Sequence, residues 1–205
     1  SKAALIDALE SIDVDMTEFD ANSDGVCDAI ILVMEGWANG SDDQFWSYKG
    51  TLNFGEAHSI DPAAGVYDDW DELTYNGIKI RNYIVTTEKM FYSDGPYYQQ
   101  GDIRPIGTFV HEIGHILGLP DLYDTSDKSA PGIGDWGLMG SGNWNNQVSP
   151  ASFSAWSAGK LGIIDLIELD DLNADELIIE PIHSTRIAYK INLGSETMGE
   201  YFLLE

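Results

Sequence analysis

The chain has 205 residues, and its 35 acidic side chains outnumber its 10 basic ones to give a formal net charge of −25. That balance excludes nucleic-acid binding, which needs a basic face, and it suits a protein that binds divalent cations or stays soluble outside the cell. Hydrophobic residues make up 43% of the chain, enough for one well-buried core, and no apolar stretch is long enough to span a membrane.

The first part of the chain predicts one helix and two strands among polar loops. Leu5, Leu9 and Ile12 recur at helical spacing in residues 1–12, and we expect them to share a buried face. The apolar run at 29–34 is bounded by turns and predicts a central strand, while residues 78–85 roughly alternate as a second strand would. Residues 36–71 are rich in Gly, Asp and Trp and are expected to form ordered loops.

An aspartate-rich loop precedes the first predicted strand. Oxygen-bearing residues recur at every second position, and Gly25 stands where an EF-hand loop has its glycine. The Glu that closes such a loop is replaced by Ile31, which excludes a complete helix–loop–helix. A shorter calcium loop feeding a strand is predicted, with these ligands: Asp20, Asn22, Asp24, the carbonyl of Val26, and Asp28. The alternative is an ordinary turn built from Asp, Asn and Gly.

Cys27 is the only cysteine, so no internal disulfide can form. It lies beside the apolar run of the first predicted strand, and we expect a buried, inert thiol.

One later segment predicts a metal-binding helix. His111 and His115 stand at i and i+4 on one helix face, so both imidazoles can reach a single ion at about 2.0–2.1 Å. Glu112 is rotated off that face and can reach a water on the metal without being a ligand, which is the arrangement of a zinc hydrolase. Pro105 suits the start of the helix, and Gly118 suits its end.

Asp121 follows where a third ligand has to come from, because Gly118 permits a sharp turn and Pro120 prevents the helix from resuming. Three protein ligands and one open position describe a catalytic zinc site. Asp124 is close enough in the sequence to be the rival third ligand. The HExxH pattern also occurs by chance in ordinary helices, but only four histidines exist in the chain and two of them lie in this motif.

A glycine-rich stretch at 134–144 supports the zinc prediction. Metzincins, a class of zinc proteases, place a tight turn with a methionine beneath the zinc site, after the third ligand. Met139 is flanked by small residues that permit such a turn. The alternative is that Met139 only fills the core of a loop, but the upstream motif favours the Met-turn.

The C-terminal part predicts a helix followed by a small sheet. Residues 150–161 predict the helix, with Ser149 as its N-cap and with Phe153, Trp156 and Leu161 toward the core. Three short apolar segments predict the strands of the sheet: residues 177–179, 187–191 and 201–204.

These elements predict an α+β fold with a mixed sheet, an active-site helix and a strand-rich C-terminal extension. We divide the chain into a catalytic domain at 1–165 and a strand-rich segment at 166–205. The first residue is not methionine, and the last predicted strand stops at Glu205 with no polar tail behind it. We therefore expect the chain to be part of a longer precursor, truncated at the C-terminal end.

Four stretches resemble the immune inhibitor A family of secreted bacterial metalloproteases: residues 111–124 (HEIGHILGLPDLYD), 135–144 (DWGLMGSGNW), 19–33 (FDANSDGVCDAIILV) and 154–162 (SAWSAGKLG). The resemblance implies a zinc-dependent endopeptidase with a metzincin-like catalytic domain, secreted or held at the bacterial cell surface. It also suggests that the strand at 78–85 is the edge along which an extended substrate lies. One departure is visible, because members often have a histidine and small residues where this chain reads MEGW at 34–37.

The sequence thus predicts hydrolysis of protein or peptide substrates, with Glu112 accepting a proton from the attacking water and passing it to the leaving amine. Two other classes stay open: a zinc hydrolase of small amides or esters, and a calcium-stabilised binding module with a relic site. A long cleft for an extended substrate distinguishes a peptidase from the first class, and the intact Glu112 argues against the second. Tyr123 and Trp136 lie near predicted ligands and are candidates for lining the cleft.

Overall fold

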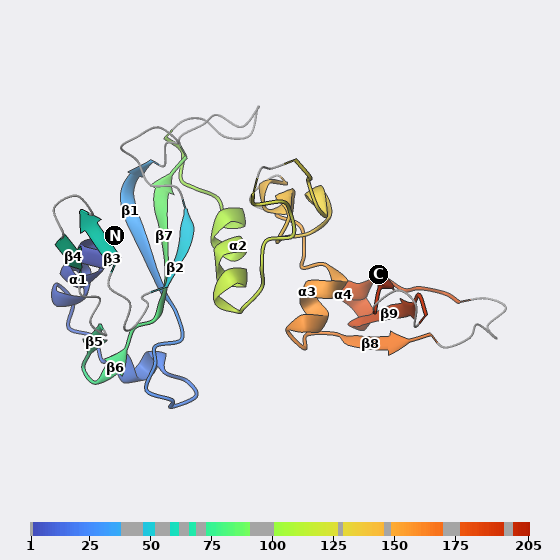
Figure 1. The fold of residues 1–205 in the computed structure, drawn as a ribbon, viewed down its shortest axis with the longest axis horizontal. Helices are drawn as coiled ribbons and strands as arrows, with labels where there is room; N and C mark the ends of the chain where they lie inside the picture. Colours follow the sequence, from blue (N-terminus) through green and yellow to red (C-terminus); the bar gives the residue numbers. More distant parts are fainter. Residues whose placement is uncertain are drawn as a thin grey trace. The chain divides into compact units, whose positions relative to one another are not determined.

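The computed structural model describes residues 2–37, 47–51, 58–61, 66–68, 73–90, 101–126, 129–145, 149–169, 177–194 and 199–205. The chain divides into two compact units, Ser1–Ile116 and Leu117–Glu205, in a mixed arrangement of few helices and small sheets (Figure 1). Within the described ranges, no helix combines the length and the apolar character that a membrane crossing requires.

A three-stranded sheet organises the first unit. Its order is β1-β7-β2, where β1 spans Ile30–Trp37, β7 spans Asn82–Lys89 and β2 spans Tyr48–Thr51. β1 runs parallel to β7, and β2 runs antiparallel to it (Figure 1). The predicted strand at 29–34 is therefore confirmed, but among the residues that the structure describes it lies at the edge of the sheet and not at its centre. β7 is the strand that is paired on both sides, and its residues 83–87 are all buried.

The same pairing corrects the expectation that the strand at 78–85 is a substrate edge. Both edges of β7 are already hydrogen-bonded to neighbouring strands, so β7 cannot accept an added strand. The outer strand on the antiparallel side is β2, which lies inside the stretch predicted to be loops.

The predicted strand at 78–85 is also two elements. β6 (Ile78–Lys79) pairs with β5 (Thr74–Tyr75) in a hairpin, and β7 begins only at Asn82. The two hairpin residues Asn76 and Gly77 have φ of 51° and 84°, which is the backbone of the tight turn that an Asn-Gly pair favours.

The loops predicted for 36–71 contain further strands. Besides β2, the strands β3 (His58–Asp61) and β4 (Val66–Asp68) form a two-stranded antiparallel sheet. The prediction of loops is wrong for these segments. Apart from Ser47, the remainder of that stretch after β1 ends at Trp37 lies outside the described residues.

The core of the first unit forms where helix α1 (Lys2–Glu10) packs near the 3-10 turn η1 (Met16–Phe19) and the strands. Leu5 and Leu9 are buried, as predicted, but Ile12 lies beyond the helix end and is 44% exposed. The buried apolar cluster has eight members: Leu5, Leu9, Met16, Cys27, Ile78, Ile80, Tyr83 and Val85.

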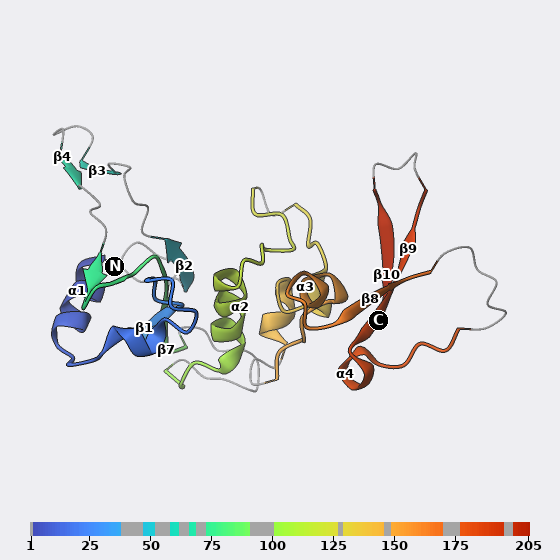
Figure 2. The same cartoon turned by 90° about the horizontal axis from the view of Figure 1, so that it is seen from below.

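Helix α2 (Ile106–Ile116) contacts β2 and β7 of this sheet (Figure 1; Figure 2). It begins directly after Pro105, and Gly118 beyond its end has a φ of +90°. Both boundaries agree with the predicted helix, because proline suits a helix start and glycine accepts the left-handed backbone that ends one.

The second unit contains turns, one short helix and a second sheet. The 3-10 turns η2 (Gly134–Trp136) and η3 (Ser141–Trp144) precede helix α3 (Ala155–Lys160), and a single helical turn, α4 (Ile182–Thr185), follows later. The sheet has the order β10-β9-β8 (Figure 2), with β8 at Asp165–Glu168, β9 at Ile187–Asn192 and β10 at Tyr201–Leu204. The strands predicted at 187–191 and 201–204 are confirmed. The strand predicted at 177–179 is wrong, and β8 was not predicted.

The helix predicted at 150–161 begins later than expected. Ser154, and not Ser149, is the N-cap, because its backbone is extended and its side chain accepts a hydrogen bond from the Ser157 N–H. The buried side of α3 consists of Ala155, Ser157 and Ala158. The predicted core residues are half-buried instead: Phe153, Trp156 and Leu161.

Candidate metal centre

Helix α2 buries two ionisable side chains of the HExxH motif. His111 is 5% exposed and Glu112 is 7% exposed, while His115 is half-buried. Burying such groups costs free energy unless they are partnered, and all three make interactions within the structure. The motif therefore lies in a shielded environment rather than on a solvated helix face.

The two histidines and Asp121 come together. The His111 and His115 ring centroids are 4.8 Å apart, and the rings meet edge to face at 87°. One ligand atom each from His111, His115 and Asp121 lies within 4.8 Å of the other two. Two imidazole nitrogens and one carboxylate oxygen form a donor set that catalytic zinc accepts. In the part of the chain that the structure describes, no second group of three such side chains converges in this way.

The chain reaches Asp121 over a short local path. α2 ends at Ile116, the left-handed Gly118 turns the backbone, and Leu119 is buried at 3% exposure. Asp121 thus follows His115 by six residues, with a helix end and a fixed turn between them. Because the path is short and anchored, its direction is set by the same residues that end the helix.

The Asp124 carboxylate is hydrogen-bonded to residues of the loop that follows it. Its Oδ1 accepts hydrogen bonds from the Ser126 N–H at 2.9 Å and from the Ser126 Oγ at 2.6 Å, and its Oδ2 accepts one from the Ser129 Oγ at 3.0 Å. This is the arrangement in which an Asp side chain closes a turn. The carboxylate that joins the histidine pair is that of Asp121, while Asp124 closes the following turn.

Met139 is fully buried, and it lies in a turn of the second unit. Its carbonyl accepts a hydrogen bond from the Leu122 N–H at 2.8 Å, and the Leu122 carbonyl accepts one from the Ile133 N–H at 3.0 Å. The backbone directly after Asp121 is therefore tied to the predicted Met-turn. Its role as a Met-turn stays a prediction.

The predicted calcium loop is held by its own hydrogen bonds. Asp20 accepts from the N–H groups of Asp24 at 3.0 Å and Gly25 at 2.8 Å, and Asp24 accepts from the Val26 N–H at 2.9 Å. Two other predicted ligands also accept backbone hydrogen bonds: Asn22 Oδ1 accepts from the Asp24 N–H, and Asp28 Oδ2 accepts from the Ala21 N–H. An Asx-type turn accounts for these bonds, so calcium binding stays a prediction.

Cys27 is 3% exposed, as predicted, and its Sγ approaches the Ala29 carbonyl oxygen at 3.6 Å. Burial raises the pKa of the thiol, which keeps it protonated and unreactive. Of the two aromatic candidates for the cleft, Tyr123 is half-buried and Trp136 is 87% exposed.

Comparison with known families supports the resemblance read from the sequence. The model of the immune inhibitor A peptidase M6 catalytic domain matches residues 6–161. The chain belongs to this family. Both the HExxH helix and the segment that carries Asp121 lie inside the range matched to immune inhibitor A peptidases. Membership of this family implies a metal-dependent peptidase domain.

Two relatives place the chain within larger proteins. It is 29% identical over 159 residues to immune inhibitor A of Bacillus thuringiensis subsp. alesti, which covers 72% of this chain and 20% of that protein. It is 40% identical over 63 residues to the pre-pro-metalloprotease PrtV of Vibrio cholerae serotype O1, which covers 27% of this chain and 7% of that protein. The chain therefore spans only a small part of the length of these relatives.

Proposed function

We propose that this chain is the catalytic domain of a zinc-dependent endopeptidase. His111, His115 and Asp121 would hold the zinc, and Glu112 is the general base. The observation that carries the proposal is the convergence of one ligand atom from each of the three predicted ligands, in a chain whose residues 6–161 match a peptidase family.

Zinc bound at this site would polarise the scissile carbonyl and supply an activated water at neutral pH. Glu112 follows His111 directly, so on the helix its side chain points about 100° away from that ligand. From there the carboxylate can accept a proton from the attacking water and pass it to the leaving amine. Its low exposure strengthens the electrostatic interaction with the reacting groups, because the local dielectric is low.

An extended peptide is the substrate form that fits the sheet. β2 pairs with β7 along one edge, contacts α2, and has no strand partner on its other edge among the described residues. An open strand edge next to the motif helix can add a peptide strand through main-chain hydrogen bonds. This argues for a peptidase over a hydrolase of small amides or esters, which needs a closed pocket.

The remaining alternative is a binding module with a relic site. The intact Glu112 argues against it, because a binding module has no need of a buried carboxylate beside the ligand pair. Incubation with unfolded casein, with and without a zinc chelator, decides between the classes. Cleavage that stops with chelator and returns with added zinc is expected. Intact casein beside rapid hydrolysis of a small amide or ester would favour the zinc hydrolase of small molecules, and no hydrolysis of either substrate would favour the binding module.

We further propose that the enzyme is secreted or surface-held, and that the Asp20–Asp28 loop binds a structural calcium ion. The family resemblance and the net charge of −25 support the first statement. The alternation of oxygen ligands in the loop supports the second. Further domains of the same precursor are proposed from the small share of each relative that the chain covers.

A further inference from the structure

The segment just before α2 is joined to the end of β7. Ile103 forms an antiparallel bridge with Lys89, and the Arg104 N–H donates to the Glu88 carbonyl at 2.7 Å. Met90, directly after β7, continues this pairing: its N–H donates to the Asp102 carbonyl and its carbonyl accepts from the Gly101 N–H, both at 2.8 Å. The motif helix is therefore preceded by backbone that is bonded to the central strand.

The side chain of Arg104 extends this attachment into the interior. The residue is 8% exposed. Its Nε donates to the Thr87 carbonyl and to Thr87 Oγ1, both at 3.2 Å, and its Nη2 donates to Thr87 Oγ1 at 2.9 Å and to the Lys89 carbonyl at 3.5 Å. All of these acceptors are neutral. Burial lowers the pKa of the guanidinium, although arginine stays protonated in proteins.

A buried guanidinium held by carbonyl and hydroxyl oxygens has a geometric consequence. The planar group presents its N–H donors in a fixed fork, so contacts with Thr87 and Lys89 together determine its position and direction. A lysine ammonium would keep the charge but could not make this set of directed bonds. The bonds therefore specify where Arg104 lies relative to β7.

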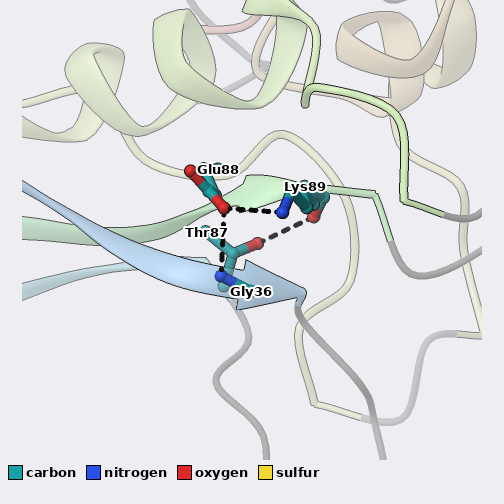
Figure 3. Close-up of polar contacts among 4 residues, drawn as sticks. All are labelled: Gly36, Thr87, Glu88 and Lys89. Atoms are coloured by element: carbon teal, nitrogen blue, oxygen red, sulfur yellow. Dashed lines mark hydrogen bonds and ion pairs between the residues drawn. The ribbon is translucent and has the colours of Figure 1, made fainter.

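The end of β7 is a firm anchor. Glu88 accepts a hydrogen bond from the Gly36 N–H of β1 at 3.4 Å and forms an ion pair with Lys89 at 3.1 Å, and Thr87 Oγ1 donates to the Lys89 carbonyl at 3.1 Å (Figure 3). Thr87 is 2% exposed. Thr87 and Lys89 are also paired with Met34 and Trp37 of β1, so this end of β7 cannot shift without disturbing its pairing with β1.

We infer that Arg104 is a positioning residue that fixes the first turn of α2 on the end of β7, and through it the ligands His111 and His115. The inference rests on the proposed function. α2 begins two residues after Arg104, and His111 is only about 7.5 Å along the helix axis from Ile106 at 1.5 Å per residue. A displacement of the helix start is therefore carried to the ligands, and metal sites tolerate distance errors of only about 0.2 Å.

The test uses the whole chain and measures metal binding instead of activity alone. Zinc affinity is determined by competition with a chelator, and the visible spectrum of the cobalt-substituted protein reports ligand geometry. Arg104→Met is expected to raise the zinc Kd about tenfold or more, in the range that outer-shell substitutions produce, and to change the cobalt spectrum. Thr87→Val should act in the same direction with a smaller effect, and Thr87→Ser, which keeps the hydroxyl, should match the wild type.

Ser47→Ala is the matched control. Ser47 is buried and shares a 2.8 Å hydrogen bond with Thr86 on β7, but this bond does not involve the segment before α2. Its loss should lower stability without altering the zinc Kd or the cobalt spectrum. An Arg104→Met protein that binds zinc like the wild type overturns the inference, and so does a Ser47→Ala protein with an equal loss of affinity.

If Arg104→Met does not fold, the comparison of Thr87→Val with Thr87→Ser decides: a lower affinity in the valine variant supports the inference, and equal affinities overturn it. A wild-type chain that binds no zinc would reject the proposed function itself, and the positioning role with it. Normal zinc binding in the wild type and in every variant would reject only the role of Arg104.

Discussion

Glu112 is the residue whose replacement best separates chemistry from metal binding. In Glu112→Gln, the amide has nearly the same shape as the carboxylate but cannot accept a proton, so peptide turnover should fall by roughly 10²- to 10⁴-fold. The zinc content should stay at the wild-type level, because Glu112 is not part of the convergent ligand group. Turnover of a peptide beside elemental analysis measures both quantities. Normal turnover, or a loss of zinc, would remove Glu112 from the role of base.

The third ligand is tested by a pair of aspartates three residues apart. Asp121→Ala should weaken zinc binding by roughly 10²-fold or more, because it removes one of three protein ligands. Asp124→Ala removes the same charge and opens a turn closed by Ser126 and Ser129, yet it should leave zinc affinity within a few-fold of the wild type. Titration with a competing chelator gives both constants. The reverse order of effects would mean that Asp124 is the ligand.

Residues whose positions depend on local geometry were the ones that the sequence could predict. His111 and His115 are related by one helical turn, and Asp121 follows after a turn that Gly118 makes possible. Arg104 gave no such signal, because its acceptors lie 15 and 17 residues earlier in the chain. Only the pairing of the segment before α2 with β7 brings them together, and that pairing is not encoded in any local pattern.

At the scale of elements, the errors have a common cause. The helix α2 and the strands β1, β9 and β10 have strong apolar patterns and were predicted. β2, β3 and β8 are each four residues long and hold at most two apolar residues, whereas the equally short β10 is a continuous apolar run, so the three gave no pattern to recognise. The hairpin turn at Asn76-Gly77, in contrast, has a local signal in the sequence, because an Asn-Gly pair favours such a turn. The N-cap of α3 is Ser154 and not the predicted Ser149, because the local backbone and the bond from the Ser157 N–H set the helix start.

The loop that carries Asp121 depends on Gly132. A Cβ added there would lie 1.7 Å from the Leu122 carbonyl oxygen, and the residue has a φ of +59°. Gly132→Ala should therefore displace Leu122, weaken zinc binding through the adjacent Asp121, and lower the free energy of unfolding by about 2–4 kcal/mol, which combines backbone strain with overpacking. Urea unfolding and chelator competition measure the two effects.

Gly134→Ala is the matched control for that experiment. Gly134 has a similar φ of +55°, but an added Cβ meets nothing within 4 Å. The free energy of unfolding of this variant should fall by only about 1–2 kcal/mol, the cost of a left-handed backbone for alanine, and its zinc affinity should not change. Equal effects of the two substitutions would show that backbone strain, and not the contact with Leu122, determines the behaviour of the loop.

At the scale of the whole molecule, the charge of −25 affects every measurement of cation binding. Carboxylates this numerous repel one another in the folded state, so any salt raises stability by screening, and divalent cations do so most strongly. A rise of the melting temperature with calcium is therefore not by itself a sign of a site. The comparison has to be made against another divalent cation at the same concentration.

We predict that calcium raises the melting temperature beyond the rise given by an equal concentration of Mg²⁺, because the Asp20–Asp28 loop binds it and leads directly into β1. At a concentration of 100 Kd, preferential binding to the native state contributes about 2.7 kcal/mol. Asp24→Ala should abolish the excess shift. Asp15→Ala is its control, since Asp15 also accepts a hydrogen bond from a backbone N–H two residues later, that of Thr17, but lies outside the loop. It removes the same charge and should retain the excess. If calcium and magnesium act alike on the wild type, or if both variants lose the excess equally, the loop is an ordinary turn and the cations act only by screening.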